Sequence, residues 1–230
     1  MIPLALTALG SLLLGLTLAT VAGGLTRAGE EPRRLARKVF HLGVFTGAVP
    51  AHLLQGFWGV VVYGSVMAGL VLVALLHGPG LAFYEALARP EKGTTPRDTV
   101  LRPLLATALG GLLAALLVGE LAVVGYLVCG WGDAAGEIVG ARWGRRRYRR
   151  PFAGAGEGSR SLEGSTAVLA VGALGAAVAV LLLGRPLQEA AVTGALCGAM
   201  GALAEGISGP GTDNLWAQLV PSLGAWWILG

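Results

Sequence analysis

Long apolar runs separated by short polar connectors dominate the chain. A helix that crosses a bilayer needs about 20 apolar residues, and the runs of this length predict helices near 2–25, 39–56, 58–77, 101–118, 121–140, 164–184, 188–206 and 214–230. The pattern therefore predicts an all-α, polytopic integral membrane protein with about eight transmembrane helices. It leaves no room for an extramembrane domain, so we expect one membrane-embedded domain over residues 1–230.

The composition supports this class. Apolar residues make up 54% of the chain and charged residues only 13%, whereas soluble domains carry about 25% charged residues. A water-soluble enzyme with a polar shell is thereby excluded. The 38 glycines are scattered through the predicted helices, as close packing of membrane helices requires, and glycine-rich helix faces of this kind also permit a homodimer.

The positive charges gather in a few connectors. Sixteen of the 17 Lys and Arg residues lie in the stretches 27–38, 89–102 and 142–160. Basic connectors are typical of the cytoplasmic side of a membrane protein, so no nucleic-acid partner is needed to explain them. We expect a multi-pass protein of the cytoplasmic (inner) membrane, with its active site facing the cytoplasm. The connectors on that face are predicted to be 26–38, 78–100, 141–163 and 207–213.

Two acidic residues interrupt the fifth apolar run. Asp133 and Glu137 are four residues apart and so share one helix face. A carboxylate inside a membrane costs at least a few kcal/mol, so both must face protein or water and have partners. Gly140 and Gly144 continue the helix and allow a ligand or another segment to approach closely. The alternative is a purely structural role in which Asp133 pairs with an arginine.

The connector after this helix combines cations, hydroxyls and glycines. Arg145–Arg150 is followed by Ser159, Arg160 and then Ser161–Ser165, which leads into the next run. Backbone N–H groups at a helix start, beside guanidinium groups, form a site for polyphosphate. Two other interpretations stay open: Ser161 as a simple N-cap, and the arginine run as a topology signal that contacts anionic lipid head groups.

Two further segments carry polar residues at the same predicted boundary. Arg37 and His41 lie on one helical face at the start of the second run, next to Lys38. Asp213 and Asn214 open the last run. Their oxygens suit a hard cation such as Mg²⁺, which takes one or two carboxylates plus phosphate oxygens and water, although Asp213 also suits a helix N-cap.

Taken in order, these segments resemble the membrane-bound polyprenol kinase family, which includes phytol kinases, dolichol kinases and a CTP-dependent diacylglycerol kinase. The resemblance covers residues 37–215. Its pieces are the early basic residues Arg37, Lys38 and His41; Gly132-Asp133 with Gly140 and Gly144; Ser161-Leu-Glu-Gly-Ser165; and Glu205 followed by Asp213-Asn214-Leu215.

The resemblance implies an enzyme that phosphorylates the hydroxyl of a membrane lipid alcohol, with CTP as the phosphoryl donor and Mg²⁺ as the cofactor. It implies that Asp133 is catalytic and that Glu163 or His41 accepts the alcohol proton. The implied metal ligands are Asp133, Asp213 and Glu137. The implied nucleotide-binding residues are Arg37, Lys38, Arg160, Ser161, Gly164, Ser165 and Asn214. In one departure, the family's usual lysine before the Ser-x-Glu-Gly-Ser piece is Arg160 here, which leaves open a nucleoside triphosphate other than CTP.

Two other functions compete with this one. A CDP-lipid synthase, which transfers a whole cytidylyl group, is similar around 133–144 and at Glu163-Gly164. However, its Ser-Pro-x-Lys and Asp-x-x-Asp signatures do not occur here. A transporter or scaffold would place relay acids at several depths in the membrane, whereas the acids of this chain cluster toward the two predicted boundaries. The sequence does not specify which lipid alcohol is the acceptor.

Overall fold

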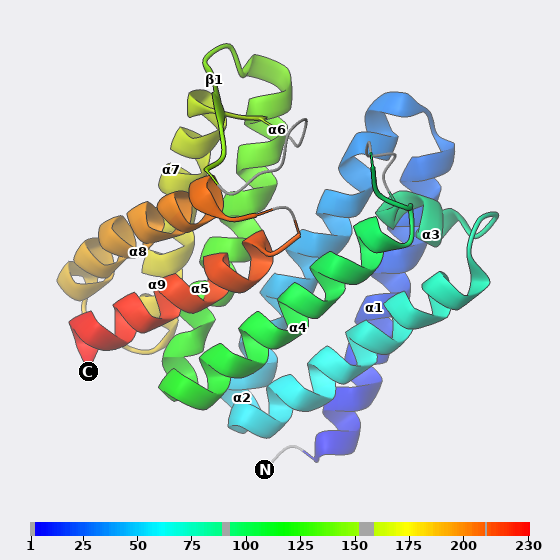
Figure 1. Ribbon diagram of the computed structural model, residues 1–230. Coiled ribbons are helices and arrows are strands. Elements are labelled where there is room, and N and C mark those ends of the chain that lie inside the picture. Colours follow the sequence, from blue (N-terminus) through cyan, green and yellow to red (C-terminus); the bar gives the residue numbers. More distant parts are fainter. Residues whose placement is uncertain (1–2, 89–92, 152–158, 210) are drawn as a thin grey trace.

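The computed structural model describes residues 3–88, 93–151, 159–209 and 211–230 and is built almost entirely of helices (Figure 1). The helices are α1 (Leu4–Arg27), α2 (Glu30–His77), α3 (Ala82–Leu87), α4 (Asp98–Val118), α5 (Ala122–Leu127), α6 (Asp133–Trp143), α7 (Leu162–Leu182), α8 (Leu187–Ile207) and α9 (Asp213–Leu229). Within the described residues every predicted apolar run is largely helical, and the predicted all-α class is confirmed.

Two of the apolar stretches are about twice the length needed to span a membrane. Among the residues that the structure describes, five helical stretches are long and apolar enough to cross one: Leu4–Arg27, Pro32–His77, Asp98–Trp143, Leu162–Leu182 and Leu187–Ile207. The second and third each contain 46 residues and are interrupted at Gly56 (φ 60°) and Gly119 (φ 57°), respectively. Glycine adopts positive φ without steric cost, so the chain folds back at both points (Figure 1). The chain is an all-α polytopic membrane protein, and the number of spans stays a prediction.

The predicted connectors contain more structure than expected. α1 ends at Arg27 and α2 begins at Glu30, so most of the 26–38 connector is helical. The reason is that Glu, Arg, Lys, Leu and Ala favour helices, which a search for apolar runs does not detect. The 78–100 connector contains α3. A short antiparallel hairpin, in which β1 (Arg147–Arg149) pairs with β2 (Ser159–Ser161), lies within 141–163 and was not predicted.

The packing is that of a membrane protein. On α4 most of the buried residues are small, among them Gly110, Gly111 and Ala114, whereas Leu116 and Leu117 are each 59% exposed. In lipid, helices associate through small residues because an exposed leucine costs nothing against hydrocarbon. The distribution therefore fits a surrounding bilayer.

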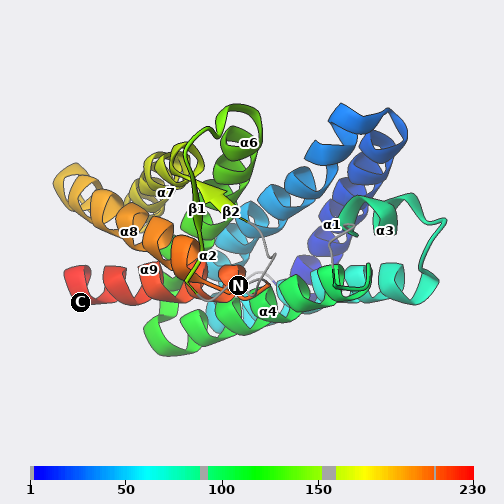
Figure 2. The same cartoon turned by 45° about the horizontal axis from the view of Figure 1, so that its top comes forward.

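α5 lies at the centre of the molecule. Val123, Val124, Tyr126 and Leu127 on this helix are almost completely buried, and α2, α4, α7 and α9 pack against it. Figure 2 shows α7, α8 and α9 on one side of the molecule and α1 and α3 on the other. It continues through a π-helical turn, Val128–Gly132, directly into α6. Such π turns occur frequently at functional sites, and here the turn leads into Asp133.

Glycine is required where α5 packs against α9. A Cβ added at Gly125 would lie 2.0 Å from the Gln218 carbonyl oxygen and 2.2 Å from Ser222 Oγ. We predict that Gly125→Ala lowers the free energy of unfolding by about 1–3 kcal/mol because the two helices must separate. Gly69→Ala in α2 is the matched control, since its Cβ would meet no heavy atom within 4 Å. Thermal unfolding in detergent measures both, and equal stabilities would contradict this packing.

Candidate functional site

Four charged side chains from α2 and α6 form the first part of the site. Lys38 Nζ lies 2.6 Å from Asp133 Oδ2 and 2.8 Å from Glu137 Oε2, and Arg37 also pairs with Glu137. We call Arg37, Lys38, Asp133 and Glu137 the α2–α6 cluster. Lys38 is 4% exposed and Asp133 is 8% exposed, so the predicted burial of a carboxylate with partners is observed.

This pairing is what allows the acids to be buried. Removing one partner of a buried ion pair leaves an unpaired charge and costs about 3–5 kcal/mol. The α2–α6 cluster therefore holds the start of α2 against α6, across about 100 residues of sequence. His41, one turn beyond Lys38, places Nε2 3.3 Å from Asp133 Oδ2.

A second charged group joins the hairpin to α8 and α9. Arg160 on β2 lies 2.5 Å from Glu205 at the end of α8 and 3.1 Å from Asp213 at the start of α9. We call Arg160, Glu205 and Asp213 the hairpin cluster. Burial opposes the charged form of Arg160, but the carboxylates of Glu205, Asp133 and Asp213 outweigh it and raise the pKa of Arg160. Arg160 and Asp213, 53 residues apart in sequence, thus lie on the same side of the molecule.

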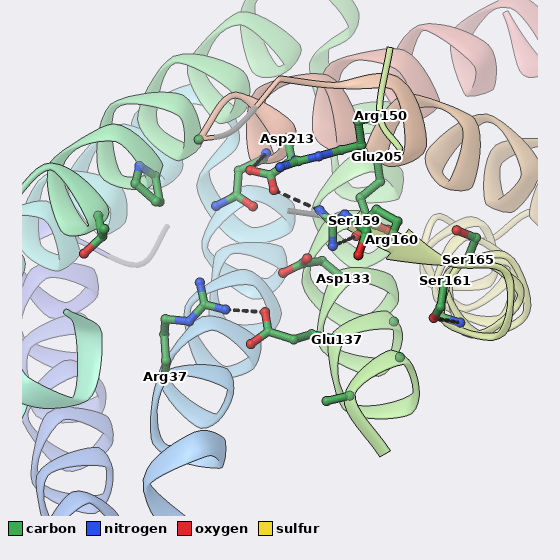
Figure 3. Close-up of a pocket in the computed structure, with 18 of the residues that line it drawn as sticks. Arg37, Asp133, Glu137, Arg150, Ser159, Arg160, Ser161, Ser165, Glu205 and Asp213 are labelled. Atoms are coloured by element: carbon green, nitrogen blue, oxygen red, sulfur yellow. Dashed lines mark hydrogen bonds and ion pairs between the residues drawn. The ribbon is translucent and has the colours of Figure 1, made fainter. Parts of the chain in front are cut away.

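Both clusters, apart from Lys38, line one polar cavity of about 570 Å³. In Figure 3 the labelled side chains of the two clusters point toward one another from α2, α6, the hairpin, α8 and α9. The charged lining residues are Arg37, Arg102, Arg147, Arg150, Arg160, Asp98, Asp133, Glu137, Glu205 and Asp213. A volume of this size is typical of a small-molecule site, and the lining offers both guanidinium groups and carboxylates.

Close contact between α6 and α7 brings the hairpin to this cavity. A Cβ at Gly164 would lie 2.8 Å from the Gly136 carbonyl oxygen, and a Cβ at Gly140 would lie 3.1 Å from Ser161 Oγ. The glycines of α6 thus let another segment approach, as the sequence predicts, and that segment is the start of α7. The same contact places Ser161 and Ser165 at the cavity wall.

The start of α7 is less open to a phosphate than the sequence indicates. Ser161 is the N-cap, and its Oγ accepts a hydrogen bond from the Gly164 N–H at 3.1 Å. The Leu162 N–H donates to the Arg146 carbonyl oxygen. Two of the amide groups expected to be free are therefore occupied, so guanidinium and hydroxyl groups are the better candidates for binding phosphate here. The Ser165 hydroxyl lies 2.7 Å from that of Tyr148.

The remaining predicted site residues take different positions. Glu163 does not line the cavity, and its carboxylate accepts hydrogen bonds from the Arg145 and Arg146 N–H groups. Lys38 reaches the cavity only through the acids that it binds. Asn214 lines the cavity and donates to Thr107 Oγ1 at 2.7 Å. The structure thus brings together the predicted residues except Glu163.

Sequence reasoning missed several residues of the cavity. Asp98, Thr99 and Arg102 come from the first turns of α4, and Arg147 and Arg150 come from the hairpin. All five lie in or beside the basic connectors, which we interpreted mainly as topology signals. The charge pattern was therefore a usable signal, but it does not tell which arginines of a run turn toward the site.

The carboxylates at the cavity are candidate ligands for a metal ion. Within the residues that the structure describes, no group of three or more His, Cys, Asp or Glu side chains is arranged to hold a metal ion. The carboxylates at the cavity nevertheless fit Mg²⁺, because this ion is commonly held by one or two carboxylates and completes its octahedron with phosphate oxygens and water.

The chain is similar in sequence to a known protein. A phytol kinase of the cyanobacterium Synechocystis sp. is 31% identical to this chain over 127 residues. The match covers 54% of the chain and 52% of the relative, so the chain spans about half the length of the curated relative that it matches. No family model and no solved structure matches the chain. The similarity supports the relationship that the ordered motifs suggest, which is to the family of polyprenol and phytol kinases.

Proposed function

We propose that this protein phosphorylates the hydroxyl group of a membrane lipid alcohol, using CTP or another nucleoside triphosphate together with Mg²⁺. The observation that carries the proposal is the polar cavity, where carboxylates and guanidinium groups from α2, α4, α6, the hairpin, α8 and α9 meet at helix ends of a membrane protein. Phosphoryl transfer depends mainly on positioning and charge neutralisation, and the cavity supplies groups for both. The similarity to a phytol kinase supports the same reaction class.

Asp133 and Asp213 are the proposed metal ligands, with Glu137 beside Asp133. When bound with the nucleotide, Mg²⁺ would neutralise charge on the β- and γ-phosphate oxygens. All three acids already pair with Arg37, Lys38 or Arg160. Entry of a metal–nucleotide complex therefore requires an exchange in which the protein's own cations turn from the carboxylates to the phosphates.

His41 is the better placed of the two proposed proton acceptors. Its Nε2 lies near Asp133 Oδ2 and 3.4 Å from the Cys129 carbonyl oxygen. Both are acceptors, so they favour a proton on Nε2 and leave Nδ1 to accept one. Glu163 is held by backbone N–H groups outside the cavity. His41 Nδ1 would take the proton of the alcohol as its oxygen attacks the γ-phosphorus.

Replacing Asp133 tests the metal site. We predict that Asp133→Asn lowers CTP-dependent phosphorylation of a lipid alcohol at least 100-fold, because a metal ligand is lost. The fold should persist, since Lys38 keeps Glu137 as a partner. Glu189→Gln is the matched control, as Glu189 is partly exposed and pairs with Arg185 away from the cavity. Transfer of labelled phosphate from CTP to the alcohol by the purified protein measures the effect. Full activity of Asp133→Asn would refute the assignment of Asp133 as a metal ligand.

Arg160→Lys tests the role of the guanidinium group. Arginine binds two acids or phosphate oxygens in a planar fork, which lysine cannot reproduce. We predict a roughly tenfold rise in the KM for the nucleotide, with the positive charge retained. Arg185→Lys, which changes an exposed arginine, should leave that KM unaltered. An unchanged KM in Arg160→Lys would remove Arg160 from the nucleotide site.

Product analysis separates the proposed kinase from a cytidylyltransferase. The kinase releases CDP and a phosphorylated alcohol, whereas a CDP-lipid synthase releases pyrophosphate. We predict CDP in a one-to-one ratio with the phosphorylated alcohol when CTP is the donor. Chromatography of the nucleotides after incubation with phytol and, in parallel, phosphatidate gives the answer, and pyrophosphate release would replace the kinase with the synthase.

A further inference from the structure

A second cavity adjoins the polar one. It has a volume of about 340 Å³ and lies between α2 and α4, and the ends of α5 and α9 also reach it. Most of its lining is apolar and includes Phe40, Val60, Met67 and Leu104. The two cavities share Arg37, Thr99, Pro103 and Asn214. A molecule with a polar end and an apolar body could therefore occupy both at once.

Polar groups of the second cavity gather where it meets the first. Asn214 Nδ2 donates to Thr107 Oγ1, and Gln218 Nε2 donates to the carbonyl oxygens of Thr107 and Asn214, at 3.2 and 2.7 Å. These bonds hold the two amide side chains in fixed orientations. His41 also lines this cavity while contacting Asp133. A hydroxyl group brought to this end lies beside the proposed proton acceptor.

We infer that the cavity between α2 and α4 is the acceptor site and holds the hydrocarbon tail of a single-chain lipid alcohol, with the hydroxyl at the His41 and Asn214 end. The inference rests on the proposed function. The volume of the cavity lies near the lower end of the roughly 300–1,000 Å³ found for small-molecule sites. This volume suits one hydrocarbon chain rather than the two acyl chains of a diacylglycerol. Because this cavity adjoins the polar one, a lipid with a terminal hydroxyl group can place that group at the polar cavity. This favours an alcohol over an ordinary bilayer lipid.

Gly64 offers a way to fill this cavity without disturbing the fold. It lines the cavity from the part of α2 that follows Gly56, where Val60, Val61 and Ala68 line it at helical spacing. A Cβ added there meets no heavy atom within 4 Å. Gly69, farther along the same helix, has equal space but does not line the cavity. Gly64→Leu and Gly69→Leu are thus a matched pair: both add the same side chain to the same helix, but only Gly64→Leu adds it at a residue that lines the cavity.

The test uses the full chain in detergent with two measurements. The first is labelling by a 20-carbon prenol that carries a photoactivatable diazirine in its tail. The second is phosphate transfer from labelled CTP to the unmodified prenol. We expect the label on peptides of α2 and α4, and we expect Gly64→Leu to reduce both labelling and transfer at least tenfold at an unchanged KM for CTP. Labelling and phosphate transfer in Gly69→Leu should stay within twofold of the values for the unmodified protein. Dioleoylglycerol should not reduce labelling by the photoactivatable prenol.

The outcomes separate this inference from the proposed function. Labelling on α7 and α8, effective competition by dioleoylglycerol, or equal labelling of Gly64→Leu and the unmodified protein overturns the acceptor site, even if phosphate transfer is observed. Labelling of α2 and α4 that Gly64→Leu abolishes supports the site. If that labelling occurs while no alcohol is phosphorylated, the cavity remains a binding site for a single-chain lipid alcohol, and the proposed kinase activity and the acceptor role fall together.

Discussion

The pairing of buried charges is the constraint on which the rest of this structure depends. Asp133 sits in a span whose neighbours are apolar, and in that setting a carboxylate is stable only beside a cation. Lys38 supplies the cation and also binds Glu137. Because these residues lie far apart in sequence, satisfying their charges fixes α2 against α6. The arrangement that solves this energetic problem also builds half of the polar cavity.

Close packing through small residues is the second requirement of this structure, beside the pairing of buried charges. Gly136, Gly140 and Gly164 let α6 and α7 approach until backbone lies against backbone, which is how helices associate where no hydrophobic effect drives them together. This contact brings the hairpin over the helix ends, where Arg160 meets Glu205 and Asp213. Helix packing and charge pairing thus produce a polar cavity at the edge of an otherwise apolar molecule.

The two adjoining cavities give the proposed reaction a physical layout. A nucleotide suits the larger one, where arginines and carboxylates face each other, and an alcohol tail suits the smaller one between α2 and α4. His41 lines the smaller cavity and contacts Asp133 at the wall of the larger one. In the proposed reaction the lipid acceptor stays in the membrane while its hydroxyl group meets the nucleotide at the polar cavity.

The sequence by itself determined the helices and most of the candidate residues. Apolar runs of spanning length predict helices because lipid leaves the backbone no other partner, and an acid such as Asp133 stands out because its burial is costly. Tertiary structure alone decided that Arg102, Arg147 and Arg150 turn into the cavity, that Glu163 does not, and that a second cavity lies beside the first. The physical reason is that side-chain direction and empty space depend on how helices distant in sequence pack, which local composition does not encode.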